Sequence, residues 1–443
     1  MKKLALHWQI LAAIFLAFAA GLTVKVMTVE GQTPPGFFGV SFLSIFDYIG
    51  TLFLNGLKMI IVPLITSSII IGVAGIGAGG NLGILGGRTL LFYATTTLAA
   101  ILLGLLIINF VEPGIVDGEP ARELLALDDK GAEIAARVEG KGPGDVADVF
   151  LRMVPPNIVQ AAADGQMLGL IFFSLLFGFF MTKVNHDFAE PLFRFWDGVF
   201  HVMMLMTEWI MKFAPIGVFG LVAAVIAKAG FAAAEPLAVF AIAVAVALLL
   251  HIFGTMSIFL TAVSGISPWK MLKAMAPAML TAFSTSSSSA TLPVTIDCVE
   301  KNVGVSNRIS SFVLPLGATV NMNGTALYEC AAALFLAQAY GLELSIGIQF
   351  SIVVIALVTS IGVAGVPSAS LVAIAIILAA VGLPVEAIGV LMVFDRLLDM
   401  MRTAANVYGD ACAAAIVAQL EGEKLTVLSN SAANDDSKTH SQS

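Results

Sequence analysis

The sequence predicts an all-α integral membrane protein with eight transmembrane helices and two re-entrant helical hairpins. Hydrophobic residues make up 58% of the 443 residues and charged residues only 12%, against about 25% in a typical soluble domain. The mean hydropathy is +0.96. A soluble chain could not cover its surface with so few charges, whereas a bilayer needs apolar runs of about 20 residues. Residues 235–264 form one such run.

Eight long apolar stretches are expected to span the bilayer, and those that exceed its thickness should tilt or kink. They lie near residues 8–28, 45–77, 88–111, 150–182, 196–227, 235–264, 309–340 and 384–419. The first stretch follows Lys2 and Lys3, and its residues 17–19 (AFA) resemble a signal-peptidase site. We expect a retained first helix, and a cleaved signal peptide is the alternative.

Two further apolar segments are interrupted. Residues 270–298 contain TAFSTSSSSATLPVT, and residues 345–381 contain TSIGVAGVPSAS. In each segment, flanks too short to cross a bilayer surround a centre rich in Ser, Gly or Pro, which is typical of re-entrant hairpins. Irregular backbone is tolerated at membrane depth only against protein or water, and a pair of such segments indicates the binding site of a transporter with inverted repeats. The alternative is a pair of ordinary serine-rich loops.

The basic residues predict cytoplasmic N- and C-termini. With the N-terminus inside, the short inside segments hold Lys2, Lys3, Arg88, Lys183, Arg194, Lys270, Lys273, Lys301, Arg308 and Lys424, and the short outside segments hold Lys25 and Lys228. In this orientation, the segment 270–298 enters the membrane from the inside and the segment 345–381 enters it from the outside. Inverted repeats require such opposite entry. The polar loop 113–148 is then extracytoplasmic, and the tail is expected to be disordered because it lacks apolar periodicity.

The last apolar stretch carries a polar stripe within DRLLDMMRTAANVYGD, residues 395–410. At 100° per residue, six side chains fall within a sector of about 100°, namely Asp395, Asp399, Arg402, Thr403, Asn406 and Asp410. A charge that faces lipid costs about 2.5–3.5 kcal/mol or more, so this face is expected to point into the protein or a polar cavity. Ionisable groups there indicate a functional site. The alternative is a salt-bridge ladder that only joins helices.

The residue types of the stripe suggest its ligand. The Arg402 guanidinium matches a carboxylate in bidentate fashion, and Asp399 suits an ammonium group. Together they fit a small molecule that bears both charges and an additional carboxylate. Hydroxyls and backbone N–H groups of the hairpin tips could hold the remaining carboxylate. Asp410 and Asn406 offer oxygen ligands for a cation.

Residues 314–329, LPLGATVNMNGTALYE, form a second polar segment. Four residues would interrupt a membrane helix, namely Gly317, Asn321, Asn323 and Gly324. Carbonyls freed at such a break can coordinate Na⁺, and a structural kink is the alternative. Burial favours the neutral form of a carboxylic acid, so Glu329 suits a proton carrier. The alternative is that Glu329 is bonded to a neighbouring hydroxyl and never cycles.

Four motifs in order resemble the dicarboxylate/amino acid:cation symporter family, which includes excitatory amino acid transporters and archaeal aspartate transporters. They are SSSSATLP at 286–293, NMNGTALYE at 321–329, AGVPSAS at 364–370 and DMMRTAANVYGD at 399–410. The resemblance runs from about residue 8 to residue 421. Four ordered matches are far more specific than a serine run alone.

The resemblance implies a homotrimer in which each subunit has a fixed scaffold and a transport domain that carries substrate by an elevator-like movement. The second hairpin would be the extracellular gate. The implied domains are residues 1–77 (scaffold helices one and two), 82–112 (helix three, transport domain), 113–148 (extracytoplasmic loop), 149–230 (scaffold helices four and five), 231–421 (remaining transport domain, with helices six to eight and both hairpins) and 422–443 (cytoplasmic tail, expected to be disordered).

Position by position, the resemblance implies that Arg402 binds the substrate side-chain carboxylate and that Asp399 binds its amino group. The substrate shell would be completed by Thr403, Asn406, Thr325, Ser288 and the backbone around Ser287 and Val366. One sodium site would use Gly317, Asn321, Asn406 and Asp410, and another would use Thr319, Ser360, Ile361 and Val363, mainly through carbonyls. Glu329 matches the position implicated in proton coupling.

Two departures from the family pattern bear on ion coupling. Sodium-coupled members usually read NMDGT, but the middle residue here is Asn323. In the family that aspartate joins a third sodium site with residues matching Tyr93, Thr96, Thr97 and Asn321, so the loss of its charge is expected to weaken the site. Members also often carry an extra arginine where this chain has Ser286 or Met400, and Arg396 is near but is not the matching residue. Counter-transport of K⁺ is therefore left open.

The sequence thus predicts a secondary active symporter, not an enzyme, that takes up L-glutamate or L-aspartate with Na⁺, H⁺ or both and needs no organic cofactor. It is expected in a bacterial inner membrane, in contact with lipid. No basic patch suggests nucleic acid.

Other functions are kept as alternatives. C4-dicarboxylates and neutral amino acids are possible substrates, but Asp399 argues against a substrate without an amine and Arg402 against one without a side-chain carboxylate. An intramembrane hydrolase using a serine of 286–289 has little support, because no histidine accompanies the serine run. A passive anion channel would differ in being unable to drive uptake uphill.

Overall fold

The computed structural model describes residues 6–28, 35–37, 39–77, 83–125, 127, 151, 154–163, 167–342, 344–362 and 370–429. Helices dominate these residues. The strands among them form two short antiparallel hairpins, β1 (Gly36–Phe37) with β2 (Val40–Ser41) and β3 (Ile115–Val116) with β4 (Glu119–Pro120). The prediction of a helical protein built from apolar helices is confirmed.

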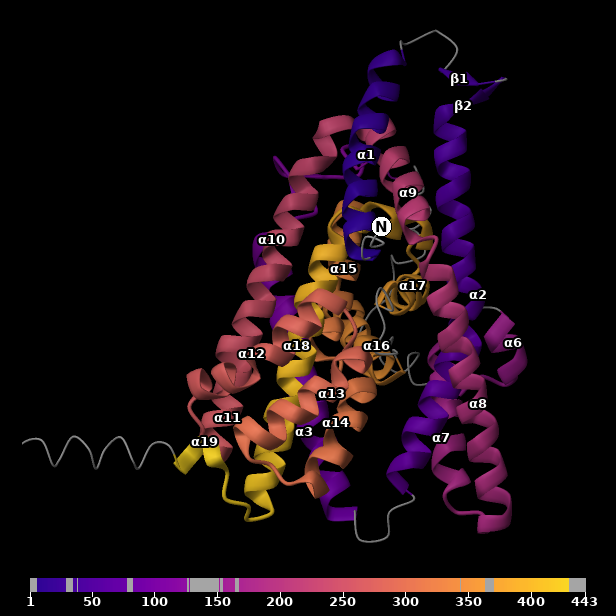
Figure 1. Ribbon diagram of the computed structural model, residues 1–443. Coiled ribbons are helices and arrows are strands. Elements are labelled where there is room, and N and C mark those ends of the chain that lie inside the picture. Colours follow the sequence, from indigo (N-terminus) through magenta and orange to yellow (C-terminus); the bar gives the residue numbers. More distant parts are fainter. Residues whose placement is uncertain are drawn as a thin grey trace, which may run out of the picture.

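A first helix group consists of α1, α2 and α6–α9, with α1 in the upper centre and α2, α6, α7 and α8 on the right of Figure 1. Its members are α1 (Leu6–Met27), α2 (Phe42–Gly77), α6 (Ile158–Ala163), α7 (Met167–Met181), α8 (His186–Met211) and α9 (Ala214–Ala229). The long helix α2 packs along α7, α8 and α9, and α1 packs along α9.

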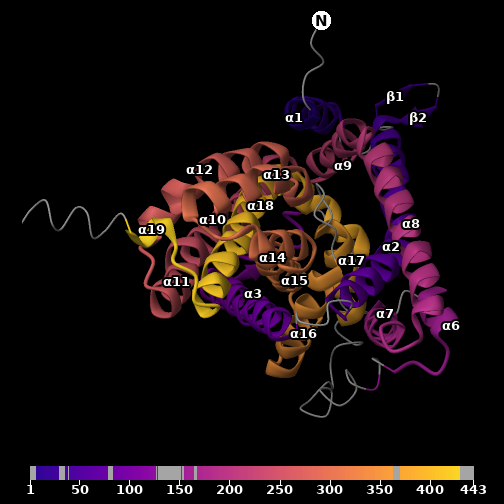
Figure 2. The ribbon, with the colours of Figure 1, turned by 60° about the horizontal axis from the view of Figure 1, so that its bottom comes forward.

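A second helix group consists of α3 and everything from α10 to α19. Its members are α3 (Gly83–Val111), α10 (Ala234–Leu250), η2 (His251–Met256), α11 (Ser257–Ser264), α12 (Pro268–Thr285), α13 (Ser288–Cys298), η3 (Val299–Val303), α14 (Asn307–Val320), α15 (Asn323–Ala339), α16 (Ile346–Gly362), α17 (Ser370–Val381), η4 (Val385–Ala387), α18 (Ile388–Leu420) and α19 (Thr426–Ser429). The turn η1 (Gly230–Ala233) joins the two groups. Helix α18 packs against α3, α10, α12, α14 and α15, and Figure 2 shows the two groups side by side, with α17 next to α2.

Three helical stretches among the described residues are long and apolar enough to cross a membrane alone, namely Trp8–Met27, Leu85–Val111 and Ala234–Ser264. Helices α8 and α9 pass the same test together, but they are bent by 57°. The stretch 196–227 is one of those expected to tilt or kink because they exceed the thickness of the bilayer, and this bend agrees with that expectation. The bend follows from Pro215 at the start of α9, because proline is tolerated in the first turn of a helix but not in its interior. The total of eight spans stays a prediction.

Both interrupted segments are pairs of helices that pack against each other, α12 with α13 and α16 with α17. The first pair turns at Ser286, which has a left-handed backbone (φ 52°). Ser287 then caps α13, and its side chain accepts a hydrogen bond from the Ala290 N–H at 3.2 Å. The tip of the second pair, residues 363–369, lies outside the described residues.

The predicted break in the seventh apolar stretch is confirmed. Helix α14 ends at Val320 and α15 begins at Asn323, and the backbone of the two residues between them is not helical (ψ 74° at Asn321 and 48° at Met322). A different irregularity, the π-helical turn η2 in the sixth stretch, was not predicted.

Helices α1, α2 and α9 approach one another closely through glycine. A Cβ atom on Gly21 would lie 2.8 Å from the Ala223 carbonyl oxygen, and one on Gly220 would lie 2.8 Å from backbone atoms of Gly50 and Phe46. Small residues that allow such approach are the usual contact residues between membrane helices.

The chain beyond α18 folds back onto the second helix group. Glu421 accepts a hydrogen bond from Arg88 of α3 at 2.7 Å and lies 3.5 Å from Arg308 of α14. Glu423 accepts a hydrogen bond from the Ser306 N–H at 3.0 Å. Residues 422–443 were expected to be disordered, but these contacts hold the chain after α18, and α19 forms at Thr426–Ser429. Residues 430–443 lie outside the described residues.

Candidate functional site

The polar stripe of α18 points into the protein, as predicted. Its six side chains are all buried, with exposed fractions between 0% for Arg402 and 6% for Asp399. Leu397 is 47% exposed. The cost of burying so many polar groups is offset because helices of the second group surround α18 and supply hydrogen-bond partners.

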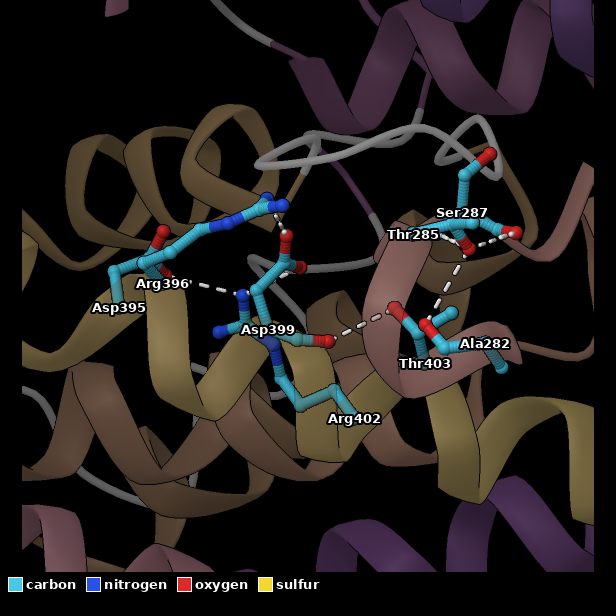
Figure 3. A network of polar contacts seen from close by, with 8 residues as sticks. All are labelled: Ala282, Thr285, Ser287, Asp395, Arg396, Asp399, Arg402 and Thr403. Carbon is cyan, nitrogen blue, oxygen red and sulfur yellow. Dashed lines mark hydrogen bonds and ion pairs between the residues drawn. The ribbon is translucent and has the colours of Figure 1, made fainter. Parts of the chain in front are cut away.

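Arg402 is the centre of a buried charge cluster (Figure 3). Its Nη2 atom lies 2.9 Å from Asp399 Oδ1 and 3.1 Å from Asp395 Oδ1. Its guanidinium carbon lies 3.8 Å from the ring centroid of Tyr328 on α15, a cation–π contact. The Nε and Nη1 atoms have no hydrogen-bond partner among the described residues. Arg402 therefore retains donors that can receive a carboxylate.

Arg396 belongs to the same cluster, although it is not one of the six residues of the predicted stripe. Its Nη1 atom lies 3.4 Å from Asp399 Oδ2, and the residue is 4% exposed. Three residues before Asp399, Arg396 is displaced by about 60° around the helix, so the periodicity that identified the stripe could also have identified Arg396. Tyr328 gave no such signal, because it lies on a different helix.

The tip of the first hairpin borders α18. Helices α12 and α13 both pack against α18. Ser286, Ser287 and Ser288 are all buried, and Ser286 Oγ has no partner among the described residues. The turn thus combines a free hydroxyl with the start of a helix, where backbone N–H groups favour anions. Val366, predicted at the other tip, lies outside the described residues.

The break between α14 and α15 is joined to α18 through Asn406. The Asn406 amide donates to Thr325 Oγ1 at 3.0 Å, and its oxygen accepts from the Gly324 N–H at 2.8 Å. A Cβ atom on Gly324 would lie 2.8 Å from the Arg402 carbonyl oxygen, so only glycine permits this approach. On α18 itself, the Thr403 hydroxyl donates to the Asp399 carbonyl at 2.8 Å. Four predicted shell residues (Asp399, Thr403, Asn406 and Thr325) are therefore brought close to Arg402.

Three members of the first predicted sodium set lie together, namely Gly317, Asn321 and Asp410. Asn321 Nδ2 donates to Asp410 Oδ1 at 2.8 Å, and Asn321 Oδ1 has no partner among the described residues. A Cβ atom on Gly317 would lie 2.7 Å from the Asp410 Cγ atom and from the Tyr93 hydroxyl. A carboxylate and a free amide oxygen next to non-helical backbone form a donor set that suits a hard cation.

The other two predicted ion sets are assembled less completely. In the second set, the hydroxyls of Thr319 and Ser360 donate to the carbonyls of Leu316 and Leu357, at 3.0 and 2.8 Å. The Ile361 side chain and Val363 lie outside the described residues.

In the third set, Tyr93 donates to the Val313 carbonyl at 2.8 Å and Thr96 to the Phe92 carbonyl at 2.8 Å. Asn323 is fully buried and its Nδ2 atom is unpartnered among the described residues. A cavity of about 570 Å³ between the two helix groups is lined by Tyr93 and Thr97 from this set and by Ser360 from the second.

Glu329 is fully buried on α15. Its Oε2 atom accepts a hydrogen bond from the Thr359 hydroxyl at 3.2 Å, and its Oε1 atom has no partner among the described residues. The neighbouring hydroxyl expected in the alternative interpretation of Glu329 is therefore present, and the other carboxylate oxygen is left without a partner among the described residues.

The described histidines give the hydrolase alternative no support. His251 is buried in η2 with both ring nitrogens unpartnered among the described residues, and His201 bonds the Asp197 carbonyl at 2.8 Å. In the part of the chain that the structure describes, no serine–histidine pair activates the serine run, as a hydrolase would require.

Comparison with known proteins identifies the family of this chain. The profile of the sodium:dicarboxylate symporter family matches residues 6–420. The chain is 35% identical to a proton/sodium-glutamate symport protein of Bacillus caldotenax (96% of both chains covered) and 34% identical to the proton/glutamate-aspartate symporter of Escherichia coli (95% of this chain, 93% of the relative). It is also 35% identical to human excitatory amino acid transporter 3 (95% of this chain, 86% of the relative). A match over nearly the whole chain, together with the buried charge cluster on α18, shows that the protein belongs to the sodium:dicarboxylate symporter family.

Proposed function

We propose that the protein is a secondary active symporter that takes up L-glutamate or L-aspartate together with Na⁺, H⁺ or both. The observation that carries this proposal is the buried Arg402, which retains free donors beside the Asp399 carboxylate. A cation and an anion fixed next to each other match an amino acid that bears an extra carboxylate. Relatives named as glutamate and glutamate–aspartate symporters support the same substrate class.

In the proposed complex, Arg402 binds the side-chain carboxylate and Asp399 binds the ammonium group. Thr403, Asn406 and Thr325 complete the shell around the substrate. The remaining carboxylate is received at the hairpin tips, by Ser288 and by the backbone around Ser287 and Val366.

Coupling ions bind in the same helix group. Na⁺ takes the set of Gly317, Asn321, Asn406 and Asp410, with a second ion at Thr319, Ser360, Ile361 and Val363. A third site at Tyr93, Thr96, Thr97 and Asn321 is weak because Asn323 brings no charge. Glu329 carries a proton.

The division of the helices into two groups supports an elevator mechanism, in which the second group moves against the first. The first group (residues 1–77 and 149–230) forms the scaffold of a homotrimer, and the second (82–112 and 231–421) forms the transport domain. The protein lies in the lipid of a bacterial inner membrane with both termini in the cytoplasm. Packed pairs of half-length helices at 268–298 and 346–381 support the two re-entrant hairpins, the second of which is the proposed extracellular gate.

Two other substrates of the same family are weaker candidates. A C4-dicarboxylate would leave Asp399 without an ammonium group, and a neutral amino acid would leave the donors of Arg402 unused. Buried polar groups without partners are costly, so both substrates should bind less tightly than an acidic amino acid.

Uptake of radiolabelled glutamate and aspartate into proteoliposomes tests the proposal, with Na⁺, H⁺ and K⁺ gradients imposed separately. We expect accumulation against a substrate gradient, driven by Na⁺ or H⁺, and its loss in Arg402→Ala. Arg194→Ala, a change at an exposed arginine on α8, is the control and should transport normally. Unchanged uptake by Arg402→Ala would reject the binding role, and purely downhill flux would indicate a channel.

A further inference from the structure

The Asp399 carboxylate lies between two arginines, and the proposed binding mode uses only one of them. Oδ1 lies 2.9 Å from Arg402 Nη2, and Oδ2 lies 3.4 Å from Arg396 Nη1. Both arginines lie on α18, three residues to either side of Asp399 (Figure 3). Arg396 is 4% exposed, and an ion removed from water is destabilising unless it is paired. The burial of the Arg396 charge therefore needs an explanation.

The charges of the cluster indicate the role of Arg396. The cluster contains two carboxyl groups, Asp395 and Asp399, and two guanidinium groups, Arg396 and Arg402, and all four residues are buried. Arg402 is shared, because its Nη2 atom contacts both carboxylates. Arg396 is thus the charge that brings the cluster to neutrality. Without it, one guanidinium would face two buried carboxylates.

We propose that Arg396 is a positioning residue that neutralises Asp399 in the substrate-free carrier and gives way to the substrate ammonium group. This inference rests on the proposed function, because it requires Asp399 to be the ammonium site. The 3.4 Å contact is longer than the roughly 2.7–2.9 Å of a strong charge-assisted hydrogen bond. Arg396 therefore compensates the charge through a weak contact that the substrate ammonium group can replace, while Arg402 remains paired with Oδ1.

The inference distinguishes two modes of transport. Exchange of external for internal substrate uses only the loaded carrier, in which the ammonium group compensates Asp399. Net uptake also needs the empty carrier to return, and there Arg396 is the compensating charge. An uncompensated carboxylate within the membrane is costly. Loss of Arg396 should therefore slow net uptake and spare exchange.

The test compares Arg396→Gln, Arg396→Lys and the double variant Arg396→Gln/Asp395→Asn in proteoliposomes. Net uptake is measured into substrate-free vesicles, and exchange is measured into vesicles preloaded with unlabelled substrate. We expect Arg396→Gln to reduce net uptake about tenfold more than exchange, which corresponds to about 1.4 kcal/mol. Arg396→Lys keeps the charge and should keep the wild-type ratio of net uptake to exchange. The double variant restores neutrality and should recover that ratio.

Several results would overturn the inference. Equal losses of exchange and net uptake in Arg396→Gln would indicate a structural role only. A wild-type ratio in Arg396→Gln, or a selective loss of net uptake in Arg396→Lys, would exclude the charge role. If Arg396→Gln does not fold, the ratios of net uptake to exchange in Arg396→Lys and in the double variant still test the inference. Absence of acidic amino acid transport by the wild-type protein would instead reject the proposed function.

Discussion

The guanidinium of Arg402 on α18 stacks on the ring of Tyr328 on α15, with 3.8 Å between the guanidinium carbon and the ring centroid. This contact joins the helix that follows the break at Asn321 to the helix that carries the proposed substrate site. It leaves the edge of the guanidinium to its ion pairs with Asp395 and Asp399. The orientation of Arg402 therefore depends on an aromatic face as well as on carboxylates.

Tyr328→Leu is expected to weaken acidic amino acid binding about tenfold. A desolvated cation–π contact is worth about 1–2 kcal/mol, and Leu removes it while keeping an apolar side chain. Tyr328→Phe keeps the ring and should retain near wild-type affinity. The substrate concentration for half-maximal uptake measures the effect. Equal affinities in the Leu and Phe variants would contradict the role of the ring.

Asn323→Asp is expected to make uptake more steeply dependent on Na⁺. Asn323 Oδ1 accepts from the Gly324 N–H at 2.8 Å, and a carboxylate can keep this bond while its second oxygen takes the place of the unpartnered amide nitrogen. The added charge should strengthen the third ion set. The Hill coefficient for Na⁺ measures the change. Asn302→Asp, at an exposed site, is the control, and an unchanged coefficient in Asn323→Asp would contradict the prediction.

Glu329→Gln is expected to remove the contribution of a pH gradient to uptake. The amide fills the same volume but cannot exchange a proton. Uptake under an imposed pH gradient, without a Na⁺ gradient, measures the effect. Thr359→Val removes the hydroxyl bonded to Glu329 and leaves the carboxyl group in place, so this variant should retain proton coupling. If wild type and Glu329→Gln respond alike to the pH gradient, Glu329 is only structural.

Gly220→Ala is expected to destabilise the first helix group by about 1–3 kcal/mol, the usual effect of overpacking. Its Cβ atom would lie 2.8 Å from backbone atoms of Gly50 and Phe46, which cannot rotate away. Gly198→Ala on α8 is a matched control, because a Cβ there meets nothing within 4 Å. Thermal unfolding of the detergent-solubilised protein measures both variants. A Tm for Gly220→Ala no lower than that of Gly198→Ala would show that the helices can separate at no cost.

Features that depend on local chemistry were predictable from the sequence. The six-residue stripe follows from helical periodicity and the cost of facing charge to lipid. The break near Asn321 follows from two asparagines and two glycines in an apolar helix, since these residues are poor helix formers. The left-handed turn at Ser286 lies within the serine run that indicated a hairpin.

Features that depend on contacts between distant segments were not predictable. Tyr328 lies 74 positions before Arg402, and Thr359 lies 30 positions after Glu329. Only packing of α15 against α18 and α16 brings these pairs together. Arg396 was predictable only in part. Its position on the helix was available from periodicity, but its pairing with Asp399 depends on the direction that its long side chain takes.

The return of the chain after α18 has a practical consequence. Because Glu421 and Glu423 fasten it to α3, α14 and the residues before α14, a dye on α19 would be held rigidly by the helices that surround Arg402. A second dye on α2 or α9 would report any displacement between the two helix groups as a change in resonance energy transfer between the dyes. Neither dye would lie near the ligand.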